Sequence, residues 1–184
     1  MLLMKFLVTL TVFINTTLVA TAADMVRSDL DQDGHVEEFG LVHQDNGQVD
    51  LRIKTNTGSD ILLPNIAWKG GLYGQSPHLS LAPNGSVLLT SKNEGCCRFR
   101  WALTVTIANR QQSYRVAGQT YSWRDTLDLD AFGRCDVNFL TGRGFLENAK
   151  GITHFASDLE AAPLAEWSQD SALPTRCNPD APAQ

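Results

Sequence analysis

The fold is decided by a segment near the middle of the chain, Phe99-Arg100-Trp101-Ala102-Leu103-Thr104-Val105-Thr106-Ile107-Ala108. From Leu103 onward apolar and polar side chains alternate, and most of them are β-branched. Alternation with a period of two predicts a strand that buries one of its faces. The residues from Asn109 to Gln112 favour a turn, so we expect Ser113–Ala117 to return as the antiparallel partner.

Similar strands are expected on both sides of this hairpin, with turn residues between them. They are Val36–His43, Val49–Lys54, Ile61–Leu63, His78–Ala82, Ser86–Thr90, Val137–Leu140 and Gly144–Glu147. Asp45-Asn46-Gly47 and Pro83-Asn84-Gly85 favour tight turns, and Pro64 is expected to end the short third strand. Short strands at this spacing are typical of antiparallel sandwiches and barrels. The predicted fold class is therefore all-β, a single antiparallel sandwich or propeller-like domain.

The C-terminal part of the chain differs from the rest. It contains the one helix candidate, about Ala156–Trp167, which Pro163 interrupts. From Pro174 onward the sequence is rich in proline and irregular. We expect a short helical or irregular tail from about residue 155, attached to the domain through Cys177.

The N-terminal segment Met1–Ala22 has the features of an export signal. Lys5 supplies a positive charge, Phe6–Val19 is largely apolar, and Ala20-Thr21-Ala22 is a small-x-small cleavage pattern. A membrane anchor is the alternative, but Asn15-Thr16-Thr17 interrupts the apolar run, and a span needs roughly 20 apolar residues. We therefore expect a cleaved signal peptide over 1–22 and one exported, soluble, periplasmic β domain over 23–184.

Composition and motifs limit the function. The chain of 184 residues suits one domain, and 15 Lys and Arg against 20 Asp and Glu give a net charge of −5. A nucleic-acid binder needs a basic face, so we do not expect that class. The four histidines are dispersed, and the H-E-x-x-H, nucleophile-elbow, P-loop and dinucleotide motifs are missing from the sequence. We therefore expect a binding protein without catalytic residues.

The four cysteines are Cys96, Cys97, Cys135 and Cys177, an even number that favours two disulfides in an exported chain. Adjacent cysteines are poorly placed to bond each other, because closing the ring strains the peptide between them. Two pairings stay open, and each ties the doublet to Cys135 and to Cys177. A thiolate metal site is the alternative, but the C-x-x-C spacing that it requires is missing.

The sharpest motif is Asp29-Leu30-Asp31-Gln32-Asp33-Gly34-His35-Val36-Glu37, with the spacing D-x-D-x-D-G-x-x-E. Calcium takes about six to eight oxygen ligands, and alternate carboxylates in a tight loop can converge on one ion. The motif predicts a Ca²⁺ site formed by Asp29, Asp31, Asp33, the carbonyl of His35, and Glu37. An EF-hand is excluded, because position twelve is Gly40 and a strand follows. A solvated acidic turn is the alternative. Asp128-Leu129-Asp130 is a weaker echo that we expect to be a loop.

The candidate binding surface is the segment Ser91–Arg98, which joins two strong strands and combines both signs of charge with glycine. The residues expected to contact a partner are Ser91, Lys92, Asn93, Glu94, Gly95, Arg98 and Phe99. The cysteine doublet would hold such a loop rigid, which lowers the entropic cost of association. The alternative is an ordinary hairpin loop.

The order of these motifs resembles a family of bacterial periplasmic proteins that carry FG-GAP-like calcium loops. The resemblance rests on Asp29–Glu37, on Arg98-Phe99-Arg100-Trp101 and on Val137-Asn138-Phe139-Leu140-Thr141-Gly142. Its best understood members are immunity proteins that inhibit lysozyme-like effectors, and they are similar in fold to periplasmic inhibitors of invertebrate-type lysozyme. The chain departs from the family in two ways. Position nine of the calcium loop is Glu37, where the family usually has aspartate, and the serine-glycine-x-x-tyrosine string of the inhibitors is missing.

The resemblance implies a periplasmic inhibitor of a lysozyme-like peptidoglycan hydrolase, which acts by inserting a loop into the cleft of the enzyme. It also implies a structural Ca²⁺ ion. The alternative function is a calcium-stabilised binding or structural module for a glycan or another envelope protein. Both functions predict a soluble protein that does not span a membrane.

Overall fold

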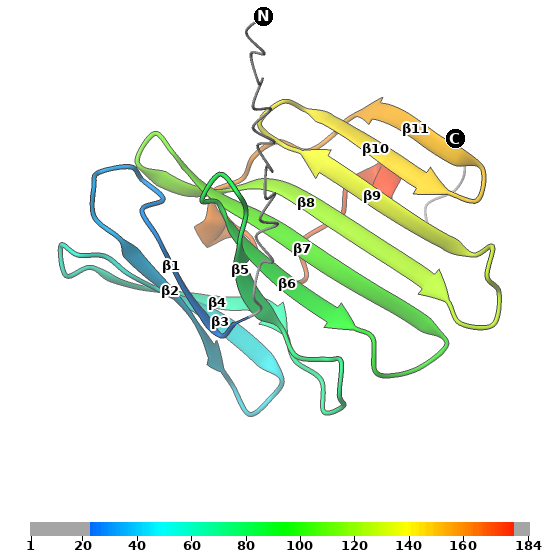
Figure 1. Cartoon of the computed structure of the whole chain (residues 1–184), viewed down its shortest axis with the longest axis horizontal. Coiled ribbons are helices and arrows are strands. Elements are labelled where there is room, and N and C mark those ends of the chain that lie inside the picture. The colour runs from blue at the N-terminus through cyan, green and yellow to red at the C-terminus, as the bar shows by residue number, and fades with distance from the viewer. Residues whose placement is uncertain (1–22, 179–184) are drawn as a thin grey trace, which may run out of the picture.

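The computed structural model describes residues 23–178, which form two antiparallel sheets packed as an open sandwich (Figure 1). The first sheet has the order β1-β2-β3-β4, with β1 (Met25–Ser28), β2 (Glu37–His43), β3 (Gln48–Lys54) and β4 (Asp60–Trp68). The second has the order β11-β10-β9-β8-β7-β6-β5. Its strands are β5 (His78–Leu81), β6 (Val87–Asn93), β7 (Phe99–Arg110), β8 (Ser113–Asp125), β9 (Phe132–Asn138), β10 (Arg143–Asn148) and β11 (Gly151–Ala156). The prediction of an all-β, sandwich-like fold is confirmed.

The hairpin of β7 and β8 is the centre of the larger sheet. Its register runs from Phe99 opposite Asp125 to Arg110 opposite Ser113, with a shift after Thr106. The alternating residues Leu103, Val105 and Ile107 are buried, as the period-two pattern predicts. The return strand extends well beyond the predicted Ala117, because its second half pairs with both β7 and β9.

The core lies between the two sheets. Its largest fully buried side chains include Phe39, Leu51 and Ile53 from the first sheet and Leu79, Leu89 and Ile107 from the second. The sheets also meet at their edges, where Ala23 and Leu79 form an antiparallel bridge just before β1. Strand β1 was not predicted, because it has only four residues and lies directly between that bridge and the acidic loop.

Strand β4 does not end at Pro64, contrary to the sequence-based expectation. The register with β3 shifts between Val49 and Leu51, and Asn65 takes a positive φ of 51°. The backbone N–H of Asn65 donates to the side chain of Asp50 in β3, at 3.0 Å from Oδ1, instead of to a backbone carbonyl. A bulge therefore accommodates the proline, which cannot donate a ladder hydrogen bond.

The predicted helix over Ala156–Trp167 is wrong. Residues Gly151–Ala156 form β11, and the chain then runs without regular structure to short 3₁₀ turns at Leu164–Glu166 and Thr175–Cys177. Pro163 cannot continue a helix, and the backbone groups beside it pair with β8 instead. The N–H of Val116 donates to the carbonyl of Ala162 at 3.0 Å. This C-terminal segment lies behind the larger sheet in Figure 1.

The prediction of two disulfides is confirmed, but the predicted pairing is wrong. Cys96 bonds Cys97, and Cys135 in β9 bonds Cys177 with their Cα atoms 5.3 Å apart. Cys135 of β9 lies opposite Tyr121 of β8. Phe99 of β7, two residues after the doublet, lies opposite Asp125, four residues farther along β8. Four strand residues span roughly 13 Å, which exceeds the reach of a disulfide. The doublet therefore pairs internally, where Cys97 turns the chain with a positive φ of 72°.

The predicted signal peptide over 1–22 lies outside the described residues. Over residues 23–178, the structure contains no helix that is long and apolar enough to cross a membrane. The strand predicted at Val137–Leu140 is displaced toward the N-terminus, because Asn138 begins the turn that follows β9 by accepting hydrogen bonds from the N–H groups of Leu140 and Thr141.

Candidate functional site

The acidic loop between β1 and β2 brings together three of its four predicted carboxylate ligands. Carboxylate oxygens of Asp29, Asp31 and Glu37 all lie within 4.8 Å of one another, and Asp33 is outside this group. Gly34 takes a φ of 89°, which permits the bend at the position that the motif predicts. Its N–H donates to Asp29 Oδ2 at 3.1 Å, so the loop closes on itself.

Glu37 is the buried member of this acidic group, with 3% of its surface exposed. Its Oε2 accepts from the N–H of Leu30 at 2.8 Å, and its Oε1 accepts from the hydroxyl of Tyr114 at 3.3 Å. Burial raises the pKa of Glu37, and burial together with the neighbouring Glu37 carboxylate raises the pKa of Tyr114. Asp29 Oδ1 is buried without a hydrogen-bond partner in the described chain. The group can therefore offer several oxygens to one hard cation.

A second candidate site lies at the opposite end of the sandwich. Tyr114 is near the start of β8 and Asp125 ends it, and a strand rises about 3.3 Å per residue, so roughly 36 Å separates them. At the Asp125 end the structure gathers the β4–β5 loop (residues 69–77), the β6–β7 loop (94–98) and the β8–β9 loop (126–131). We call these three loops the loop end.

The loops of the loop end are bonded to one another. The N–H of Glu94 donates to the carbonyl of Gly74 at 3.0 Å, and the N–H of Thr126 donates to the carbonyl of Arg98 at 2.9 Å. A Cβ added at Gly95 would clash with the carbonyl oxygen of Tyr73, so only glycine allows these two loops to pack so closely. The three loops therefore form one preorganised surface.

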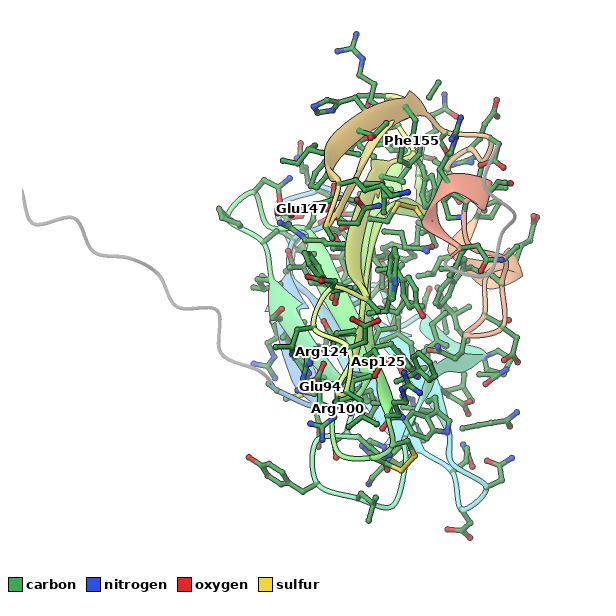
Figure 2. All side chains as sticks on the ribbon, turned by 90° about the vertical axis from the view of Figure 1, so that its right-hand side faces the viewer. Glu94, Arg100, Arg124, Asp125, Glu147 and Phe155 are labelled. Carbon is green, nitrogen blue, oxygen red and sulfur yellow. A yellow bond between two sulfur atoms is a disulfide. The ribbon has the colours of Figure 1, made fainter. Side chains whose placement is uncertain are left out.

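Ion pairs strengthen this arrangement. Figure 2 shows Glu94 of the β6–β7 loop, Arg100 of β7, and Arg124 and Asp125 of β8 gathered in one region. Arg124 pairs with Glu94, and Arg100 Nη1 donates to the carbonyl of Glu94 at 2.8 Å. Arg98 Nε donates to Asp125, while its side chain remains 53% exposed and its guanidinium lies 5.4 Å from the Phe99 ring.

The predicted binding residues have different environments. Ser91 is buried, and its hydroxyl donates to the carbonyl of Trp68, so it supports the core. Asn93 Oδ1 accepts from Gln75 Nε2, and Lys92 lies in β6 opposite Ala102. The structure leaves Gly95, Arg98 and Phe99 exposed at the loop end, whereas Glu94 is partly covered.

Sequence reasoning missed the most exposed apolar side chains of the loop end. Tyr73 is 100% exposed, Leu129 is 84% and Leu127 is 78%, with Leu72 also exposed. In the sequence, these residues lie in loops without periodicity, so only the fold reveals that they share one end. Large apolar side chains exposed on neighbouring loops make the loop end a candidate interaction surface.

Comparison with family models, with curated proteins and with solved structures gave no match to this chain.

Proposed function

We propose that this chain is an exported, periplasmic protein that binds another protein through its loop end, and that the partner is a lysozyme-like peptidoglycan hydrolase. The observation that carries the proposal is the exposure of Tyr73, Leu127 and Leu129 on loops that are bonded to one another. Large apolar side chains outside the core are costly to expose to water, and their burial by a partner makes association more favourable.

The loop end is suited to binding without rearrangement. A rigid surface loses less conformational entropy on association than a mobile one. Here the bond from Glu94 to Gly74, the pair of Arg98 with Asp125 and the Cys96–Cys97 disulfide all restrain the central loop. Tight inhibition needs this property, because an inhibitor must present its contacts in the shape of the cleft.

Arg98 supports the choice of a glycoside hydrolase as partner. Such enzymes carry two carboxyl groups that flank the scissile bond. Arg98 uses Nε to bind Asp125, and no hydrogen bond from its two Nη groups occurs within residues 23–178. Those Nη groups are therefore available to a carboxylate of the partner, and arginine is enriched among residues that dominate binding energy.

The proposed Ca²⁺ ion would be held by Asp29, Asp31 and Glu37, with backbone carbonyls and water completing about six to eight ligands. Its role would be structural, since the acidic loop is at the other end of the sandwich from the loop end. A bound cation would also offset the repulsion among three carboxylates, one of which is buried.

A glycan-binding or envelope-binding module is the second candidate, supported by the solvent-facing side of the larger sheet. Thr90 and Thr104 are hydrogen-bonded there at 2.9 Å, and Thr120 donates to Asp136 at 2.6 Å. The exposed Arg134 covers the Phe145 ring at 5.5 Å, close to these hydroxyl groups. Hydroxyl groups beside an aromatic ring suit a sugar.

The test is the clearing of a peptidoglycan suspension by lysozyme-type hydrolases, including one encoded beside this chain, with and without residues 23–184. A stoichiometric amount should slow at least one hydrolase. If a molar excess slows none of them while the chain binds purified peptidoglycan directly, the inhibitor proposal fails and the glycan-binding module replaces it.

A further inference from the structure

A polar side chain interrupts the apolar interior face of the larger sheet. Gln119 of β8 lies between Val105 of β7 and Val137 of β9, and both valines are buried. Gln119 itself is only 4% exposed, and its Nε2 has no hydrogen-bond partner in the described part of the chain. Buried amide donors are almost always paired, and residues 23–178 supply no hydrogen bond to this one, so it has room for an acceptor from a ligand.

Gln119 lines a cavity of about 200 Å³ between β8 and the C-terminal segment. The other lining groups are mostly apolar and include Val116, Phe139, Leu159 and Trp167. An apolar cavity of about 150 Å³ is enough to bind benzene. The space is therefore adequate for a single ring with a small substituent, and it exceeds what one water molecule fills.

The walls of this cavity are fixed before any ligand enters. Arg115 Nη1 donates to the carbonyl of Ala161 at 2.9 Å, and the N–H of Val116 donates to that of Ala162. Farther along the C-terminal segment, Asn65 Nδ2 donates to Asp170 Oδ2 at 3.0 Å. The segment is thus tied to both sheets, and a ligand would meet a preformed pocket.

We propose that this cavity binds a small, neutral, single-ring molecule with one hydrogen-bond acceptor, which receives the unpaired Nε2 proton of Gln119. The ring would lie among Phe139, Leu159 and Trp167. Two exposed carboxylates, Glu160 and Glu166, line the same cavity and disfavour an anion. This inference is independent of the proposed hydrolase partner.

Acetophenone and α-methylstyrene test the proposal, because they have nearly the same shape and only the first has an acceptor. In ¹⁵N spectra of residues 23–184, acetophenone should shift the side-chain amide signals of Gln119 saturably. It should bind about tenfold more tightly than α-methylstyrene, because a pocket built around a polar contact rejects the analogue that lacks it.

In Gln119→Leu the preference for acetophenone should disappear while α-methylstyrene still binds. Ser122→Ala, on the other face of β8, is the matched control and should keep the preference. If Gln119→Leu does not fold, Ala172→Leu at the rim of the cavity should weaken both ligands. Equal affinities of the two probes in the wild type, or no saturable shift at Gln119, would overturn the proposal and leave a water-filled cavity.

Discussion

Arg98 Nε donates to both carboxylate oxygens of Asp125, at 2.8 and 2.6 Å, and so joins the β6–β7 loop to the end of β8. The same carboxylate accepts from the N–H of Leu127 at 2.8 Å and from that of Asp128 at 3.3 Å. One buried, ionised side chain thus holds two neighbouring loops of the loop end in place.

The hydrogen bond from Arg98 lowers the pKa of Asp125. A carboxyl group with a lowered folded-state pKa contributes stability above its ordinary pKa of about 3.9, and this stability is lost as the pH falls through the folded-state value. Asp125→Asn should therefore lower the free energy of unfolding at neutral pH, and the difference from the wild type should disappear below about pH 4. Urea unfolding of both proteins, from neutral pH to below about pH 4, measures this difference. Asp45→Asn, in an exposed turn, is the control. If the stability difference between Asp125→Asn and the wild type does not change with pH, the ionised Asp125 carboxylate does not stabilise the fold.

Calcium should raise the melting temperature of residues 23–184. A ligand that binds only the folded state adds about 2.7 kcal/mol at a hundredfold excess over Kd. Asp31→Ala should abolish the response, because it removes one of three converging carboxylates, and Asp45→Ala should retain it. Differential scanning calorimetry in millimolar calcium and in chelator provides the measurement. Equal melting temperatures of the wild type in the two buffers would exclude the site.

Glu37→Gln should stabilise the calcium-free protein at neutral pH. Burial raises the pKa of Glu37, so the charged form is disfavoured in the folded state, and stability should increase as the pH falls through that raised value. The variant keeps an oxygen for the N–H of Leu30 while removing the charge. Chemical unfolding in chelator should show a higher midpoint and a weaker pH dependence than in the wild type. A lower midpoint would mean that the ionised carboxylate is itself stabilising.

The two disulfides should contribute very differently to stability. Cys135 and Cys177 are 42 positions apart, and a closed loop of that length is worth about 4 kcal/mol in the chain-entropy model. The Cys135→Ala/Cys177→Ala variant should lose most of that amount, while Cys96→Ser/Cys97→Ser should lose little, because adjacent residues close almost no loop. Urea unfolding compares them, and non-reducing peptide mapping checks the pairing. A peptide that joins Cys96 or Cys97 to Cys135 would contradict the structure.

The sequence predicts those parts of the fold in which local pattern and tertiary burial agree. The alternation in β7 and the turn at Asp45–Gly47 are of this kind, and both occur in the structure. The second half of β8 was missed because Gln119 breaks its apolar alternation, although pairing with two neighbours keeps it extended. At Pro64 the local signal predicts the end of a strand, but a bulge that only tertiary contacts create accommodates the proline within β4.

The candidate sites likewise differ in whether their residues are close in sequence or are brought together only by the tertiary fold. The spacing from Asp29 to Glu37 identifies the acidic loop, because all its groups are close in sequence. The loop end joins residues from three distant loops, and its exposure depends on strand register, so neither Tyr73 nor Leu129 carries a signal in the sequence. The cysteine pairing failed likewise, because the distance from the doublet to Cys135 is set by the register of β8.

Binding of a lysozyme-like hydrolase to the loop end is tested most directly by measuring the affinity of the hydrolase for single-residue variants of this protein. Calorimetric titration should show that Tyr73→Ser and Arg98→Ala each weaken binding about tenfold or more, which corresponds to about 1.4 kcal/mol. Asp45→Lys, in a different turn, should change the affinity much less. Unchanged affinity in both Tyr73→Ser and Arg98→Ala, with the variants folded, would contradict the assignment of this surface.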